Sequence, residues 1–118
     1  MAFHNQTGEL GEQLANQFLI TKGFNIVCCN WRYKHWEVDI IATKNKVLHF
    51  IEVKTRRSEK YGNPEDGVSK SKLKNLIDAA EEYTIQHPEW KWICFDILAI
   101  TLNTGCPPEY YLIEDVYL

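Results

Sequence analysis

Two apolar segments that follow one another almost without a break place the strongest constraint on the fold of this chain. Residues 36–43 (WEVDIIAT) and 46–55 (KVLHFIEVKT) are rich in β-branched and aromatic residues, which favour strands. Only a short polar stretch around Asn45 separates them, so we expect the two strands to pair as an antiparallel hairpin. A fold that contains this hairpin must contain a β-sheet.

Helical and strand patterns on either side of the hairpin complete an α/β fold. Apolar residues recur at helical spacing in two segments, and apolar runs mark three further strands. The predicted elements, in chain order, are a helix over 7–22, strands over 24–33, 36–43 and 46–55, a helix over 69–87, and strands over 92–102 and 110–116. The order α-β-β-β-α-β-β indicates a mixed β-sheet flanked by helices, and the length suits a single domain over residues 1–118.

The composition places the chain among ordinary globular proteins, with 45% hydrophobic and 25% charged residues. Its four cysteines lack the paired spacing of a zinc site and are too few for a secreted disulfide scaffold, so we expect reduced, mostly buried thiols. The first residues do not form a signal peptide, and no apolar run approaches the roughly 20 residues that a membrane span needs. We therefore expect a cytoplasmic protein that has no membrane partner.

Two carboxylates of the hairpin are expected to lie side by side. Either register that a tight turn allows places Asp39 and Glu52 on one face of the sheet, diagonal or directly opposite, roughly 4.5–8 Å apart. Like charges at that separation destabilise each other unless a cation lies between them. A pair of carboxylates suits Mg²⁺ or Mn²⁺, which also accept the phosphate oxygens of a substrate.

Further charged residues are predicted to surround this pair. Lys54 follows Glu52 on the same face, where its ammonium group would orient an attacking water or neutralise charge on a phosphorane. Glu37 is expected to share a face with Asp39 and Ile41. The same spacing also suits an exposed strand face that carries a ladder of ion pairs, so the strands alone leave both interpretations open.

The first predicted helix carries one more acidic residue near its apolar stripe. Glu12 falls next to Ala15 and Leu19 rather than on the far side of the helix. A solvated residue that flanks the stripe is the alternative interpretation of this position. The helix therefore adds a candidate acid to the site without establishing it.

Several short motifs occur along the chain in a fixed order. They are Gly11-Glu12-x-x-Ala15, Asn30-Trp31-Arg32, Glu37-Val38-Asp39-Ile40-Ile41, Phe50-Ile51-Glu52-Val53-Lys54-Thr55-Arg56, Lys72 and Phe95-Asp96. In this order the motifs resemble the YraN-like family of small bacterial proteins, which is similar to the PD-(D/E)xK nuclease superfamily. The resemblance runs from about Gly8 to Ile100 and implies a restriction-endonuclease-like fold with three α/β/α layers.

The resemblance also implies roles for particular residues. The implied roles are metal binding by Asp39, Glu52 and the Val53 carbonyl, catalysis by Lys54, an acid from the first helix at Glu12 as in resolvase-like enzymes, and an accessory role for Glu37. The sequence departs from the family at Trp36, where glycine is usual, and at Cys94, where arginine is usual. Both departures lie outside the implied set of metal ligands.

The charge of the chain is unevenly distributed, although its net value is only −3. Residues 54–74 hold seven basic and three acidic residues, a net charge of +4, while the remainder holds six basic and thirteen acidic residues, a net charge of −7. The basic residues of this segment are Lys54, Arg56, Arg57, Lys60, Lys70, Lys72 and Lys74. Arg56, Arg57 and Lys72 are the candidate phosphate contacts, and a solubilising helix face is the alternative.

Aromatic residues gather at the predicted turn that precedes the hairpin. Trp31, Tyr33 and Trp36 suit stacking on unpaired bases, and packing at the rim of the core is the alternative. His49 is expected to point away from the Glu52 face, so it is not placed in the site.

These observations favour a metal-dependent nuclease that hydrolyses phosphodiester bonds in DNA rather than RNA, with branched or single-stranded DNA as candidate substrates. A non-catalytic nucleic-acid-binding module on the same fold is the alternative function. A protein-interaction domain with a vestigial acidic cluster is a third interpretation. The oligomeric state is open, and the dimers common among resolvase-like proteins make a homodimer one candidate.

Overall fold

The computed structural model describes residues 6–57 and 70–116 of the chain. It contains helices α1 (Gln6–Thr21) and α2 (Lys70–Gln86) and strands β1 (Asn25–Tyr33), β2 (Trp36–Lys44), β3 (Val47–Arg56), β4 (Ile93–Thr101) and β5 (Glu109–Ile113). The strands form one sheet in the order β1-β2-β3-β4-β5, in which only the β3–β4 pair is parallel. The predicted α/β fold and its element order are confirmed. The predicted loop over residues 58–67 lies outside the described residues.

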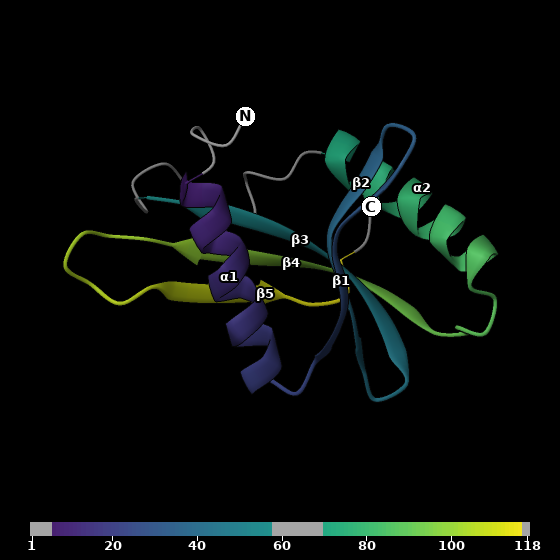
Figure 1. Ribbon diagram of the computed structural model, residues 1–118, viewed down its shortest axis with the longest axis horizontal. Coiled ribbons are helices and arrows are strands. Elements are labelled where there is room, and N and C mark those ends of the chain that lie inside the picture. Colours follow the sequence, from purple (N-terminus) through teal and green to yellow (C-terminus); the bar gives the residue numbers. More distant parts are fainter. Residues whose placement is uncertain (1–5, 58–69, 117–118) are drawn as a thin grey trace.

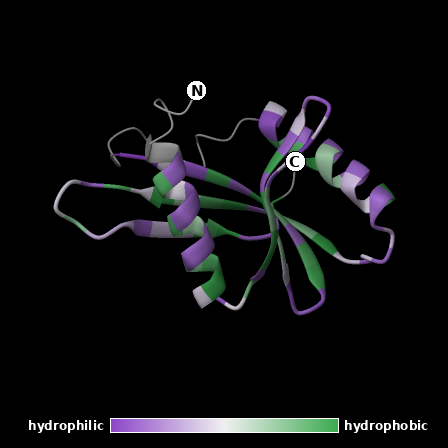
Figure 2. Ribbon diagram, viewed as in Figure 1, coloured by the Kyte–Doolittle hydropathy of each residue, from purple (hydrophilic) through white to green (hydrophobic). Residues whose placement is uncertain are grey.

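The two helices cover opposite faces of the sheet. Ala15 and Leu19 of α1 pack on Ile51 of β3, in a cluster that we call the α1-side core. Leu76 of α2 packs in a second cluster with Phe50, which we call the α2-side core. Neighbouring residues of a strand point to opposite faces, so these two contacts place a helix on each side of β3. Figure 1 shows α1 crossing the sheet and α2 beside the β1–β2 hairpin, and Figure 2 shows hydrophobic segments, alternating with hydrophilic ones, on the strands beneath α1.

The β2–β3 hairpin has the tight antiparallel geometry that the sequence predicts. Lys44 pairs with Val47 across a two-residue turn, whose Asn45 and Lys46 both have positive φ values, 52° and 67°. Two such residues are typical of the turn that matches the natural twist of paired strands. Pairing between β2 and β3 extends only to Ile40 and Ile51, and beyond that point the two strands separate.

A bend in β1 and β2 accompanies this separation. Val38 and Ile41 both pack in the α2-side core, whereas Ile40 packs in the α1-side core. Regular alternation would place Val38 and Ile40 on the same face, so the strand turns over between them. Asn30, opposite this bend on β1, has a left-handed φ of 53°. The prediction that Ile41 shares a face with Glu37 and Asp39 is therefore wrong.

The end of β5 and the cysteines also differ from expectation. β5 ends at Ile113 because Asp115, with φ 57°, turns its backbone N–H to the Asp96 carboxylate at 2.9 Å. All four cysteines are free thiols, but Cys106 is exposed in the β4–β5 turn and the others are only half-buried. The expectation of mostly buried thiols is therefore wrong. Within residues 6–57 and 70–116, neither helix is long and apolar enough to cross a membrane.

Candidate active site

A cleft of about 750 Å³ opens where β2 separates from β3. Because the strands part there, side chains from α1 on one face and α2 on the other reach the same space. The lining residues are Glu9, Glu12, Asn30, Arg32, Glu37, Asp39, Val53, Lys54, Thr55 and Lys72. The sequence-predicted Glu12, Glu37, Asp39, Val53, Lys54 and Lys72 are thus brought together.

Helix α1 reaches the cleft because Gly11 allows it to approach β3 closely. A Cβ atom at this position would collide with the Thr55 side chain. One residue later, the half-buried Glu12 accepts a hydrogen bond at Oε1 from Asn30 Nδ2 at 3.0 Å. Asparagine tolerates the left-handed conformation better than most residues, so Asn30 can both bend β1 and hold this carboxylate.

Asp39 occupies the point at which the strand ladder stops. Its Oδ2 accepts a hydrogen bond from the backbone N–H of Val53 at 2.8 Å. The carboxylate thus replaces the main-chain acceptor that a continued β2–β3 ladder would offer. Glu52, the residue before Val53, is half-buried beside Asp39 and is not itself part of the cleft lining.

The electrostatics of this carboxylate pair oppose full ionisation. Burial raises the pKa of Asp39 above its usual value, the Val53 N–H opposes that change, and the charges of Glu37 and Glu12 add to it. Burial and the neighbouring Asp39 raise the pKa of Glu52 to about 7. Lys72 lowers the pKa of both carboxylates but does not cancel the increase. The positive charge near the pair is therefore too small to offset the burial and mutual repulsion of the two carboxylates.

The donor set fits a hard divalent cation with an open coordination sphere. Within the described part of the chain, no three His, Cys, Asp or Glu side chains gather as metal ligands. Mg²⁺ is commonly held by one or two carboxylates and keeps several waters or substrate oxygens, so two carboxylates and a carbonyl suffice. Asp39 and Glu52 would hold such an ion, with the Val53 carbonyl as the third protein oxygen.

The candidate basic residues divide between two regions. Lys54 and Lys72 line the cleft. Arg57 instead lines a smaller hollow of about 260 Å³ between α1 and the β4–β5 turn, and Arg56 lines neither. The backbone carbonyl of Arg56 accepts a hydrogen bond from Leu102 at 2.8 Å, which fixes this end of β3 against β4. Of the predicted set Arg56, Arg57 and Lys72, only Lys72 lines the cleft, and Lys60 of the basic segment lies outside the described residues.

Comparison with known proteins assigns the chain to a family. Residues 11–100 match the family that is described as "Uncharacterised protein family UPF0102". The chain belongs to UPF0102. This result confirms the resemblance to YraN-like proteins.

Relatives within UPF0102 extend over most or all of the chain. The UPF0102 protein of Flavobacterium psychrophilum is 43% identical over 100 residues, which cover 85% of this chain and 84% of that protein. The UPF0102 protein of Rhodococcus opacus is 36% identical over 118 residues, which cover 99% and 100%. That of Parabacteroides distasonis is 40% identical over 118 residues, which cover 99% and 96%.

The departure of this UPF0102 chain at Trp36 does not strain its backbone. Trp36 begins β2 opposite Tyr33, and it is not among the described residues with positive φ. The adjacent turn places its left-handed residue at Lys34 instead, with φ 58°. The glycine that is usual in the family is therefore not needed for the conformation found here. Cys94, the other departure, is half-buried on β4, away from the cleft lining.

Four residues of the cleft lining were not predicted from the sequence as functional, namely Glu9, Asn30, Arg32 and Thr55. Asn30 and Arg32 appeared only as parts of a motif, yet Asn30 holds Glu12 and Arg32 forms an ion pair with Glu37 at 2.8 Å. An asparagine within an apolar strand was the available signal for Asn30, because it marks a break in the strand. His49 lies away from the cleft, as predicted, and its Nδ1 bonds the buried Asp96 carboxylate at 2.6 Å.

Proposed function

We propose that this UPF0102 chain is a cytoplasmic metal-dependent nuclease that hydrolyses phosphodiester bonds in DNA. The observation that carries the proposal is the pair of half-buried carboxylates, Asp39 in the cleft lining and Glu52 beside it, together with the two lysines that line the same cleft. Such a pair is unfavourable without a cation, and a phosphodiester is a ligand that a cation and lysines attract together. The YraN-like resemblance supports the same chemistry.

The protein residues around the pair have distinct proposed tasks. A bound Mg²⁺ would supply Lewis acidity and a lowered pKa for the attacking water. Lys54 orients that water and neutralises charge that develops on the phosphate. Lys72 binds a neighbouring phosphate, and Glu12, fixed by Asn30, accepts a hydrogen bond or proton from a water on the α1 side. Glu37 orients Arg32 through their ion pair.

Cleavage of labelled DNA tests the proposal. We expect the wild type with Mg²⁺ or Mn²⁺ to cleave single-stranded or branched DNA, and Asp39→Asn or Lys54→Ala to reduce the rate at least a hundredfold. Asp78→Asn and Lys91→Ala are matched controls, because Asp78 pairs with Lys74 on α2 and Lys91 is exposed away from the cleft lining. Equal cleavage by wild type and both site variants would show that the activity comes from a contaminant.

A non-catalytic nucleic-acid-binding module is the second candidate. It is favoured by the finding that no third acidic, histidine or cysteine ligand joins Asp39 and Glu52 among residues 6–57 and 70–116. Calorimetry separates the two functions, because a binding module takes up DNA without taking up a divalent ion. Sedimentation of the same samples tests the candidate homodimer, and a single monomeric species with and without DNA would exclude it.

A further inference from the structure

We propose that the end of the β1–β2 hairpin, residues 31–38, is a base-stacking surface for unpaired nucleotides of a nucleic acid whose backbone enters the cleft. We call this segment the ribbon. The inference rests on the proposed function for the class of ligand, a nucleic acid. It adds that the ribbon recognises unpaired bases of that ligand.

The ribbon is a two-stranded structure with no third strand beside it in the described sheet. Trp31, Arg32 and Tyr33 pair with residues 36–38, whereas pairing of β2 with β3 begins only at Ile40. The residues on each face of the ribbon therefore come only from β1 and β2. Tyr33 lies opposite Trp36, and Arg32 lies opposite Glu37. One face is aromatic, and the other is charged and lines the cleft.

The aromatic face is an ordered row of rings. Trp31 and Tyr33 are parallel within 10° with their centroids 6.3 Å apart, and Tyr33 and Trp36 are parallel within 13° at 6.3 Å. At the inner end, Trp31 packs edge-to-face on Tyr83 of α2, which anchors the row to the α2-side core. Trp36 forms the outer end, where it packs against the α2-side core and is only half-buried.

Basic groups accompany the rings along the ribbon. Arg32 is 72% exposed, and Lys34 places its Nζ 5.5 Å from the centre of the Tyr33 ring. His35 lies against Trp36 with centroids 4.9 Å apart. Aromatic rings interleaved with cations are typical of surfaces that bind single strands, because the rings stack on bases and the cations contact phosphates. This charge complementarity favours a nucleic acid over an apolar protein segment as the occupant.

The position of the ribbon joins this surface to the cleft. Arg32 and Glu37 belong to the ribbon and also line the cleft, because their ion pair lies on the charged face of the ribbon. A strand whose phosphate lies near Lys54 and Arg32 can turn its next bases over the edge of the ribbon towards Trp36. A fully paired duplex cannot do so without losing base pairs, which costs a few kcal/mol per step. The ribbon thus selects substrates that already have unpaired bases.

The test measures binding in EDTA, where cleavage cannot occur. The probes are a single-stranded oligonucleotide and a blunt duplex of the same sequence, each with one 2-aminopurine, followed by fluorescence anisotropy and quenching. We expect the wild type to bind the single strand at least tenfold more tightly than the duplex. Trp36→Leu, which keeps an apolar side chain, should weaken single-strand binding about tenfold, leave duplex binding unchanged and reduce the quenching.

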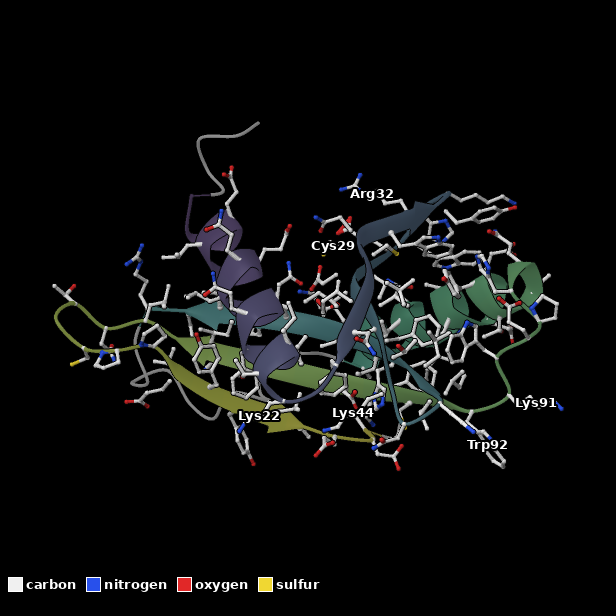
Figure 3. The ribbon with its side chains drawn as sticks, turned by 60° about the horizontal axis from the view of Figure 1, so that its bottom comes forward. Lys22, Cys29, Arg32, Lys44, Lys91 and Trp92 are labelled. Carbon is white, nitrogen blue, oxygen red and sulfur yellow. The ribbon has the colours of Figure 1, made fainter. Side chains whose placement is uncertain are left out.

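Two further variants interpret the result. Trp36→Phe retains a ring and should recover most of the binding and quenching. Trp92→Ala is the matched control, because Trp92 is 70% exposed and projects on the opposite side of the molecule from Arg32 in Figure 3. Should Trp36→Leu fail to fold by circular dichroism, Lys34→Gln, at an exposed turn position, is expected to lower the affinity and its salt dependence instead.

The outcomes separate this inference from the proposed function. Unchanged single-strand affinity in Trp36→Leu, or an equal loss in Trp92→Ala, overturns the base-stacking surface even if the wild type cleaves DNA. Loss of cleavage in Asp39→Asn with unchanged single-strand binding supports both the cleft chemistry and the separate ribbon. Cleavage that does not depend on Asp39, together with a ribbon that still binds single strands, overturns the nuclease proposal and leaves the stacking surface in place.

Discussion

The substitution Glu52→Gln removes one of the two neighbouring carboxylates whose charge Lys72 only partly offsets. In the metal-free protein the pKa of Glu52 is about 7, against 4.5 for an ordinary glutamate. Below pH 4.5 the residue is protonated in both the folded and the unfolded chain, so its ionisation has no effect on stability. Between pH 4.5 and 7 only the unfolded chain ionises, so the wild type loses stability as the pH rises, and above pH 7 that loss is complete.

The size of this loss follows from the difference between the two pKa values. A gap of about 2.5 pH units at 1.36 kcal/mol each corresponds to about 3 kcal/mol. The pKa of Asp39 is also raised, so its ionisation acts in the same direction. Glutamine does not ionise, and the variant should therefore gain about 3 kcal/mol relative to wild type between pH 5 and pH 8. For a chain of this size, that gain corresponds to a relative increase in Tm of about 10 °C.

Urea unfolding of both proteins in EDTA, followed by circular dichroism at several pH values, measures this difference. Apart from Asp39, whose titration depends on the neighbouring Glu52, the chain titrates equally in the two proteins, so the difference between their stabilities reports on this carboxylate pair. With Mg²⁺ in place of EDTA the advantage of the variant should shrink or reverse at pH 8, because a cation stabilises the ionised pair. Parallel pH profiles for wild type and Glu52→Gln would refute the account of this carboxylate pair.

Substitutions at three further positions test two residues at the cleft and one buried acid away from it. Gly11→Val should push α1 away from Thr55, lowering the Tm by several degrees and the cleavage rate more than tenfold, as thermal unfolding and a cleavage assay would measure. Asn30→Gly should preserve the Tm but lower the cleavage rate, because glycine keeps the left-handed backbone and loses the hydrogen bond to Glu12. Asn30→Ala should lose the same bond and also cost about 1 kcal/mol in urea unfolding, because alanine disfavours the left-handed conformation. Asp96→Ala should cost about 3–5 kcal/mol of folding stability with no change in Mn²⁺ affinity by calorimetry, because its partners are His49 and the Asp115 backbone.

The hairpin that positions Asp39 and Glu52 was predictable from the sequence. Alternating side chains and a short polar turn leave few registers, and the pair of Lys44 with Val47 belongs to one of those expected. Glu12 was also placed at the correct margin of its helix, because helical spacing fixes which residues adjoin Ala15 and Leu19. The regular spacing of apolar residues made these features predictable from the sequence.

The bend that opens the cleft was not predictable by the same reasoning. Period-2 alternation assumes a regular strand, so it could not foresee that β2 turns over between Val38 and Ile41 or that Asn30 bends β1 opposite. Which basic residues line the cleft was also not predictable from charge counts. Charge counted along the chain ignores where a strand carries its residues, and Arg57 lies beyond the cleft although it is close to Lys54 in sequence.

Location of a bound cation tests the central claim most directly. A crystal of the protein soaked in Mn²⁺ and measured at the manganese absorption edge would show the ion through its anomalous scattering. We predict a single strong peak between the carboxylates of Asp39 and Glu52, within bonding distance of the Val53 carbonyl, and its loss in Asp39→Asn. An empty cleft at millimolar Mn²⁺, or a peak held only by other residues, would contradict the claim that this carboxylate pair binds the catalytic metal.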